Sequence, residues 1–158
     1  MIDFIIFMGD HHVVDTKLFG IKRMKGFVSL LMKKLFINFQ NKLIEAVEAF
    51  PQFRPPARFE DIKSYVRGYL GEGNKMGEGW LLTGEMLELI HTGIDNIICT
   101  QPFGCLPNHI VGKGMIRKIR ENHPGANIVA IDYDPGATKI NQENRIKLMI
   151  ANAGRSTV

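Results

Sequence analysis

The sequence predicts a helix-rich α/β fold with a small parallel sheet, built as a C-terminal βαβα unit. Three observations predict this class. The chain has 158 residues, the length of one ordinary domain, and 45% of them are apolar and 23% charged, as is typical of a chain that buries its own core. Helical apolar spacing dominates the N-terminal part. Later, two β-rich runs alternate with helical stretches, which implies parallel strands joined by a right-handed crossover.

The N-terminal third is dense in large apolar side chains. Residues 1–8 are too few for periodicity to decide between a strand and a buried helix. From Thr16 onward the spacing becomes helical, and a second helical stretch covers about 41–50. Apolar residues at three- and four-residue steps share one face: Leu18, Ile21, Met24, Val28, Leu31 and Leu35. Four more residues widen that face, so we expect this helix to be buried on more than one side: Phe27, Leu30, Phe36 and Phe39.

Three prolines at positions 51, 55 and 56 end this helical part, because proline cannot donate into a helical ladder. Five glycines between Gly68 and Gly79 mark a tight or mobile loop. The elements expected after the prolines are, in chain order, a helix at 59–70, a helix at 80–91, a strand at 96–99, a helix at 108–122, a strand at 127–131 and a helix at 139–151.

Composition excludes several functional classes. Twenty basic against sixteen acidic residues give a net charge of +4, which is too mild to predict nucleic-acid binding. No apolar run approaches the roughly 18 residues of a membrane-spanning helix, so we expect no membrane association. Two cysteines make neither a disulfide framework nor a zinc-ligand set. A reducing, cytoplasmic setting fits this cysteine usage.

Basic charge is concentrated between Thr16 and Ile44, a stretch without any acidic residue. Its seven basic residues are Lys17, Lys22, Arg23, Lys25, Lys33, Lys34 and Lys42. This basic block is either a solvated helix face or a binding surface for a polyanion, such as the phosphates of a coenzyme or an acidic partner protein.

Two loops follow the predicted strands, and ligands of open parallel sheets bind beyond the carboxyl ends of the strands. The first loop, 101–114 (QPFGCLPNHIVGKG), holds Cys105 in a proline-stiffened turn at the start of a helix. Backbone N–H groups there favour a thiolate; a small buried apolar residue is the alternative. His109 could lie over the same turn. Cys99, inside the strand, is expected in the core.

Two motif matches in these loops fail. Lys113 lies in a Gly-Lys-Gly run that lacks the first glycine and the Ser/Thr of a phosphate loop. In the second loop, 132–138 (DYDPGAT), Asp132 and Asp134 resemble the nucleophile loop of aspartate-dependent phosphatases. That loop carries Thr or Val where this chain has Gly136. A turn that leads into a helix capped by Thr138 is the simpler interpretation.

Three segments closely resemble one family: 77–86 (GEGWLLTGEM), 96–116 (NIICTQPFGCLPNHIVGKGMI) and 127–149 (NIVAIDYDPGATKINQENRIKLM). It is the 2-hydroxyacyl-CoA dehydratase superfamily, in particular the long fused proteins described as activators of 2-hydroxyglutaryl-CoA dehydratase. The resemblance implies a Rossmann- or flavodoxin-like sheet and an iron–sulfur cluster, with Cys105 as one ligand by matching motif. Residues expected near that ligand are Gln101, Pro102, Asn108, His109, Lys113, Asp132 and Asp134.

The resemblance also sets the expected organisation. We expect one α/β domain over 1–158, a piece of a larger protein, with a helical part at 1–53 and a family-like part at 54–158. The family's other cluster cysteines lie upstream, and its ATP-hydrolysing module has no counterpart here. In the family the cluster passes one electron to a 2-hydroxyacyl-CoA so that water can leave.

Several partners follow from this resemblance. We expect an upstream domain or partner subunit, an acyl-CoA as a candidate ligand, and a homo-oligomer formed through an uncovered sheet edge. The chain alone should be inactive. The alternative is a non-catalytic interaction or regulatory subunit that binds a partner protein.

Overall fold

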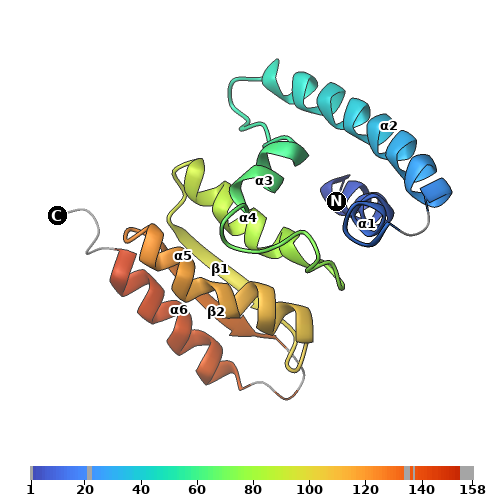
Figure 1. Cartoon of the computed structure of the whole chain (residues 1–158). Coiled ribbons are helices and arrows are strands. Elements are labelled where there is room, and N and C mark those ends of the chain that lie inside the picture. The colour runs from blue at the N-terminus through green and yellow to red at the C-terminus, as the bar shows by residue number, and fades with distance from the viewer. Residues whose placement is uncertain (1, 21–22, 134–135, 137, 154–158) are drawn as a thin grey trace. The chain divides into compact units, whose positions relative to one another are not determined.

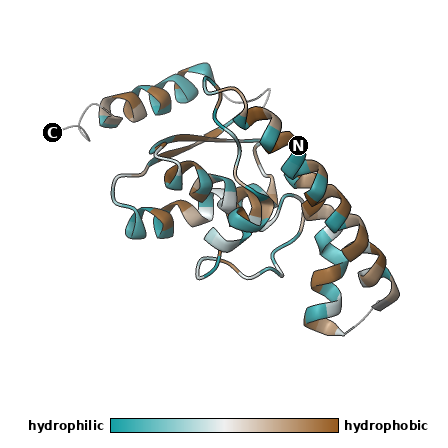
Figure 2. Cartoon of the chain, turned by 90° about the horizontal axis from the view of Figure 1, so that it is seen from above, coloured by the Kyte–Doolittle hydropathy of each residue, from teal (hydrophilic) through white to brown (hydrophobic). Residues whose placement is uncertain are grey.

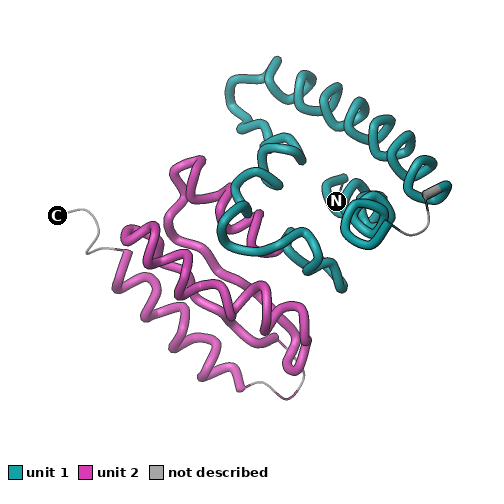
Figure 3. The backbone as a smooth tube through the Cα atoms, in the orientation of Figure 1, with its two compact units in different colours: residues 1–81 teal, residues 82–158 magenta. Residues whose placement is uncertain are grey.

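The computed structural model describes residues 2–20, 23–133, 136 and 138–153. The chain forms two compact units, Met1–Leu81 and Leu82–Val158 (Figure 3). Within the described residues, the first unit is helical and the second holds a two-stranded parallel sheet. The predicted helix-rich α/β class is confirmed at this level.

Two helices, α1 (Ile2–Phe19) and α2 (Arg23–Glu48), form an antiparallel hairpin in the first unit (Figure 1). Asp3 meets Gln40 and Asp10 meets Lys33, so the start of one helix lies beside the end of the other. The open question at 1–8 is therefore settled as helix for residues 2–8, and Met1 lies outside the described residues. The helix expected from Thr16 begins at Arg23 instead, and no separate helix starts near residue 41. Gly20, with a φ of 65°, ends α1 in a conformation that glycine adopts without strain.

An aromatic core holds the first unit together. The Trp80 ring lies 5.3 Å from the Phe7 ring and 5.6 Å from the Phe59 ring, centroid to centroid. Phe59 opens α3 (Phe59–Tyr65), which is shorter than the predicted helix, and Trp80 opens α4 (Trp80–His91) at the predicted bounds. The buried members of this core are Ile6, Phe7, Phe59, Ile62, Val66, Trp80 and Leu81.

The apolar face predicted to be buried in α2 is exposed among the described residues. Met24 is 82% exposed, and Leu31 is 52% exposed. We call Met24, Phe27, Val28, Leu31, Leu35 and Phe39 the outer apolar face of α2. Figure 2 shows apolar bands along this helix. Of the four residues expected to widen the buried face, Phe36 packs partly buried against the core, while Phe27, Leu30 and Phe39 are exposed. The expected burial is therefore wrong for most of this helix. Its inner face carries Gly26, Lys33, Gln40 and Ile44.

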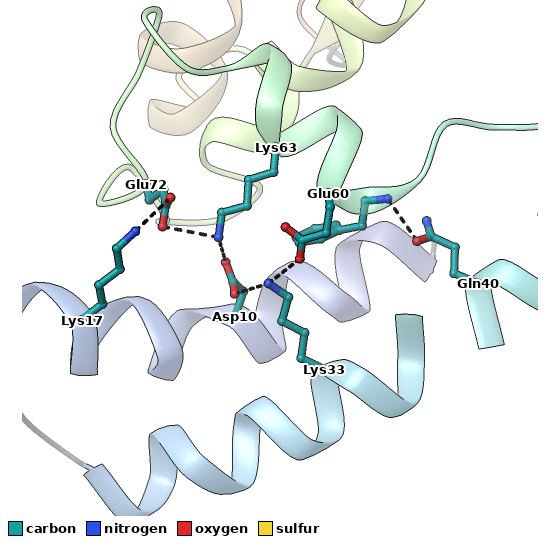
Figure 4. Close-up of polar contacts among 8 residues, drawn as sticks. Asp10, Lys17, Lys33, Gln40, Glu60, Lys63 and Glu72 are labelled. Carbon is teal, nitrogen blue, oxygen red and sulfur yellow. Dashed lines mark hydrogen bonds and ion pairs between the residues drawn. The ribbon is translucent and has the colours of Figure 1, made fainter. Parts of the chain in front are cut away.

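A buried carboxylate explains that inner face (Figure 4). Asp10 of α1 is 1% exposed. Its Oδ1 lies 2.8 Å from Lys33 Nζ of α2, and its Oδ2 lies 2.6 Å from Lys63 Nζ of α3. Burial raises the pKa of Asp10, but the hydrogen bonds and charges of the two lysines outweigh it and hold that pKa below its ordinary value. One carboxylate thus joins three helices.

Outer carboxylates complete the charge balance of the network. Lys33 also pairs with Glu60 at 2.8 Å, and Lys63 pairs with Glu72 at 3.3 Å. Lys17 approaches Glu72 at 3.4 Å. Burial alone would lower the pKa of Lys33. The hydrogen bonds and charges of Asp10 and Glu60 outweigh burial, so the pKa of Lys33 lies above its ordinary value. Each of the two lysines therefore pairs with both Asp10 and a glutamate.

The second unit confirms the predicted parallel pair. β1 (Asn96–Gln101) pairs with β2 (Asn127–Asp132) in register from Asn96↔Asn127 to Gln101↔Asp132. The helix predicted at 108–122 is divided into a π-helical turn (Asn108–Gly112), a 3₁₀ turn (Lys113–Met115) and α5 (Ile116–Asn122). The buried Thr83 hydroxyl donates to the Val111 carbonyl in the π turn. Gly114 permits the tight turn, because a Cβ there would lie 2.9 Å from the His109 carbonyl oxygen.

Helices cover the sheet of the second unit unequally. Figure 1 shows α5 across the two strands, and this side holds most of the buried apolar residues: Leu87, Ile97, Val111, Met115, Ile119 and Ile128. By contrast, α6 (Lys139–Ala153) lies along β2 without a single buried residue. The side of β2 next to α6 is therefore loosely covered.

The Asp10 network predicts a large loss of stability on neutralising Asp10. Asp10→Asn keeps the side-chain shape but leaves Lys33 and Lys63 without their shared anion. Breaking a buried ion pair in this way costs about 3–5 kcal/mol, and urea unfolding of the full chain would measure it. Glu60→Gln is the matched control, since Glu60 is exposed and should cost less than about 1 kcal/mol.

Acid titration of stability tests the same carboxylate. Because its folded pKa lies below the unfolded value near 3.8, Asp10 stabilises the fold above that pH. This contribution is lost as pH falls through the folded pKa. The wild-type chain should therefore lose more stability in acid than Asp10→Asn. Identical acid profiles for the two proteins would contradict the assignment.

Candidate functional site

The two predicted site loops begin side by side at the carboxyl ends of the strands. Gln101 and Asp132 are register partners at the last rung of the sheet. The Gln101 side chain is 2% exposed, and its Nε2 donates to Asp132 Oδ1 at 2.6 Å. Its Oε1 is buried, and no donor among the described residues reaches it. This edge therefore presents a buried polar group that needs a donor.

A tight turn presents Cys105. The turn starts at Pro102, which is exposed, and closes when the Cys105 N–H donates to the Pro102 carbonyl at 3.3 Å. Gly104 has a φ of 75°, the left-handed region that favours glycine. The backbone becomes helical at Leu106, and the Cys105 carbonyl accepts the N–H of His109 at 3.0 Å. Cys105 is thus the residue immediately before the first helical turn, as predicted.

Asn108 binds the side chain of Cys105, and His109 binds its backbone carbonyl. Asn108 is buried, and its Nδ2 donates to Cys105 Sγ at 3.0 Å. His109 Nδ1 lies 2.9 Å from the Cys105 carbonyl oxygen and donates to it. The structure therefore brings both predicted neighbours to Cys105, Asn108 at the sulfur and His109 at the backbone.

Cys99 lies in a different environment from Cys105. It sits in the middle of β1 and pairs with Ala130 in the register of the sheet. Burial raises the pKa of the Cys99 thiol, because a thiolate there loses hydration without gaining a partner. Both thiols are half-buried, so the local partners distinguish them more than exposure does.

The remaining predicted neighbours are not gathered around the sulfur by any described contact. Lys113 is exposed in the 3₁₀ turn. Asp134 lies outside the described residues. Among the described residues, no group of three or more His, Cys, Asp or Glu side chains could hold a metal ion. An iron–sulfur cluster needs about four protein ligands, and Cys105 is the one among the predicted site residues that carries a thiol.

The described residues of the basic block lie in two different environments. Lys17 and Lys33 are held in ion pairs with acidic residues of the first unit. Lys25, Lys34 and Lys42 are exposed on α2, while Lys22 and the side chain of Arg23 lie outside the description. Part of the predicted block is thus structural, and binding of a coenzyme or acidic partner stays a prediction for the rest.

Three side chains with no predicted role bind the backbone of β2. Arg120, Gln142 and Arg145 donate to carbonyl oxygens of that strand. No local sequence pattern marks them, because their partners are backbone atoms that any residue type supplies.

Comparison with known proteins adds no relative: the chain matches no protein-family model, no curated protein and no solved structure. None of the described helices combines the length and apolarity needed to cross a bilayer.

Alkylation should distinguish the two thiols. At about pH 8 we expect Cys105 to react faster with iodoacetamide than Cys99, since burial suppresses the Cys99 thiolate. Peptide mass mapping over time would measure both rates, and the difference should narrow as pH rises. Alkylation in denaturant is the control, where both thiols should react at one rate. Faster labelling of native Cys99 would reverse the assignment.

Proposed function

We propose that this chain contributes Cys105 as one ligand of an iron–sulfur cluster in a protein similar to the 2-hydroxyacyl-CoA dehydratases. The remaining ligands come from another domain or a partner subunit. The observation that supports this proposal is the hydrogen bond from Asn108 Nδ2 to Cys105 Sγ, in a turn beyond the carboxyl end of β1. The motif resemblance supplies the class of protein.

The position of the thiol suits a ligand role. Cluster ligands are thiolates, and hydrogen bonds to their sulfurs help to set the reduction potential. Asn108 provides such a donor from a buried position, so its orientation is held by packing. Pro102, Gln101 and Asp132 lie at the same end of the sheet, where parallel sheets bind ligands. We propose that this sheet is part of a larger Rossmann- or flavodoxin-like sheet.

The described residues cannot hold a four-iron cluster by themselves, since one thiol with a donor leaves most ligand positions to be filled. The proposal therefore gives this chain one role, which is to bind and position one iron of the cluster through Cys105. Electron transfer to a 2-hydroxyacyl-CoA belongs to the complete assembly, and the chain alone should be inactive.

Anaerobic reconstitution tests the proposal. Iron and sulfide added to the isolated chain should yield little bound iron. A co-expressed partner encoded beside it, which carries further cysteines, should restore the visible absorbance of a cluster. Cys105→Ser should abolish that absorbance, and the matched variant Cys99→Ser should largely spare it. A full cluster in the Cys105→Ser complex would overturn the proposal.

Asn108 provides a milder test within the same complex. Asn108→Asp keeps the size of the side chain but replaces the N–H donor with a carboxylate. If Cys105 is a ligand, the cluster should still form with a lower reduction potential, because negative charge near the sulfur disfavours the added electron. An unchanged potential would contradict a role for this hydrogen bond.

A second candidate is a non-catalytic interaction or regulatory subunit, and the outer apolar face of α2 favours it. Six large apolar side chains are exposed there, beside the exposed lysines Lys25, Lys34 and Lys42. Large exposed apolar patches mark binding sites. The fitting partner would be a protein surface with an apolar centre and an acidic rim. Cys105→Ser would leave such binding unchanged, which separates the two candidates.

The outer apolar face should bind an anionic apolar dye. We expect anilinonaphthalene sulfonate to fluoresce with the native chain and to lose most of that signal with Leu31→Gln/Leu35→Gln. Thermal stability should change little, because both residues are exposed. Glu45→Gln on the same helix is the control. Undiminished fluorescence in the double variant would show that the dye binds elsewhere and would remove support for this candidate.

A further inference from the structure

The strand β2 has one unpaired edge in the described chain. The N–H of Asn127 donates to the Asp95 carbonyl, and the N–H of Tyr133 donates to the Gln101 carbonyl, each at 2.7 Å. Odd-numbered residues of β2 therefore direct their backbone groups toward β1. Ile128, Ala130 and Asp132 direct theirs to the outer edge, where the described sheet has no third strand.

Side chains occupy the carbonyl positions that a third strand would use. Arg120 of α5 donates to the Ile128 carbonyl. Arg145 Nη1 and Gln142 Nε2 of α6 donate to the Ala130 and Asp132 carbonyls, each at 3.1 Å. All three substitutes are donors, so they satisfy only the carbonyl groups of the edge.

The outward N–H groups of the same three residues have no acceptor within the described part of the chain. At this edge the carbonyl groups therefore have hydrogen-bond donors, while the N–H groups still need the acceptors that a neighbouring strand would supply. Such an edge favours the addition of a strand.

Space is available on both faces of this edge. One hollow, of about 900 Å³, lies between β2 and α6, and Val129 and Ile131 help to line it. Another, of about 580 Å³, lies on the α5 side beside Ile128 and Ala130. Arg120 and Arg145 line both hollows. None of the residues of α6, the helix beside the first hollow, is buried.

We propose that β2 pairs with β2 of a second copy, antiparallel about a two-fold axis at Ala130. The result is a continuous four-stranded sheet. In this register each Ala130 exchanges both backbone hydrogen bonds with its counterpart, and each Ile128 lies opposite Asp132 of the second copy. The outward N–H groups then gain the acceptors that they lack within the described residues of one copy, and the displaced side chains move into the hollows.

Charge complementarity favours a second copy as the occupant. The edge is polar along its length: Arg120 binds at the Ile128 end, and the acidic Asp132 stands at the other end. Antiparallel pairing brings Asp132 of the second copy opposite Ile128, within reach of Arg120. The two-fold axis repeats this ion pair at both ends of the interface, so the edge is complementary to itself.

Cysteine crosslinking tests the register. In the background Cys99→Ser/Cys105→Ser, Ala130→Cys would place two thiols across the axis, where paired Cα atoms are about 5.5 Å apart and a disulfide can form. Mild oxidation should give a covalent dimer. Thr100→Cys is the matched control on the outer edge of β1 and should stay monomeric. Equal or faster crosslinking at residue 100 would overturn the proposal.

Sedimentation equilibrium with charge variants provides the second test. Arg120→Glu and Asp132→Arg should each weaken dimerisation about tenfold, since each removes two ion pairs per dimer. The combined variant Arg120→Glu/Asp132→Arg should recover most of that loss. A monomeric wild-type chain at high concentration, or a dimer that the combined variant does not restore, would overturn the proposal.

These outcomes are independent of the iron–sulfur proposal. The crosslinking background already lacks Cys105, so a dimer there supports the edge whatever Cys105 binds. Circular dichroism of each variant confirms folding, and Ala130→Cys remains informative if a charge variant fails to fold.

Discussion

The buried carboxylate of Asp10 constrains the whole first unit. A charge removed from water costs several kcal/mol unless it is paired, so Lys33 and Lys63 must reach it from two different helices. That requirement places Lys33 on the inner face of α2, together with Gln40, which binds Asp3 and the N–H of Phe59. The inner face of α2 combines these polar contacts with Phe36 and Ile37, which are partly buried against the aromatic core. Most of the other large apolar residues of α2 are exposed. The ion-pair network thus fixes which side of α2 faces the other helices, and the outer apolar face lies on the opposite side of that helix.

The same requirement acts on the backbone of the second unit. Carbonyl groups of β2 that lack a neighbouring strand take donors from Arg120, Gln142 and Arg145, because buried or half-buried backbone groups without partners are costly. These long side chains reach the strand from α5 and α6. Gln101 shows the opposite case: its Nε2 has a partner and its buried Oε1 has none among the described residues. Hydrogen bonds from side chains to the strands, more than apolar packing, therefore shape the edge and the carboxyl end of this sheet.

Sequence reasoning succeeded where the signal was local. Two β-rich runs gave the parallel strands within two residues, and the pattern before Gly93 gave α4 at its observed bounds. It failed in α2, because periodicity identifies an apolar face without telling which way that face points. The deciding residue, Asp10, lies 23 positions from Lys33. An acid inside the apolar run IIFMGDHHVV was the available signal. The spacing of Cys105 and Asn108 was visible in the sequence, but the orientation of the amide toward sulfur depends on its burial.

The two proposals for the second unit limit each other. β1 and β2 are parallel, so Cys105 lies beyond the end of the sheet where both strands finish. Antiparallel pairing of β2 with a second copy turns that copy's carboxyl ends toward the opposite end of the four-stranded sheet. The two Cys105 thiols would then stand at opposite ends and could not bind one cluster. A dimer of this kind leaves each thiol as a single ligand, so the remaining cluster ligands must come from a different polypeptide or from another domain of the same protein.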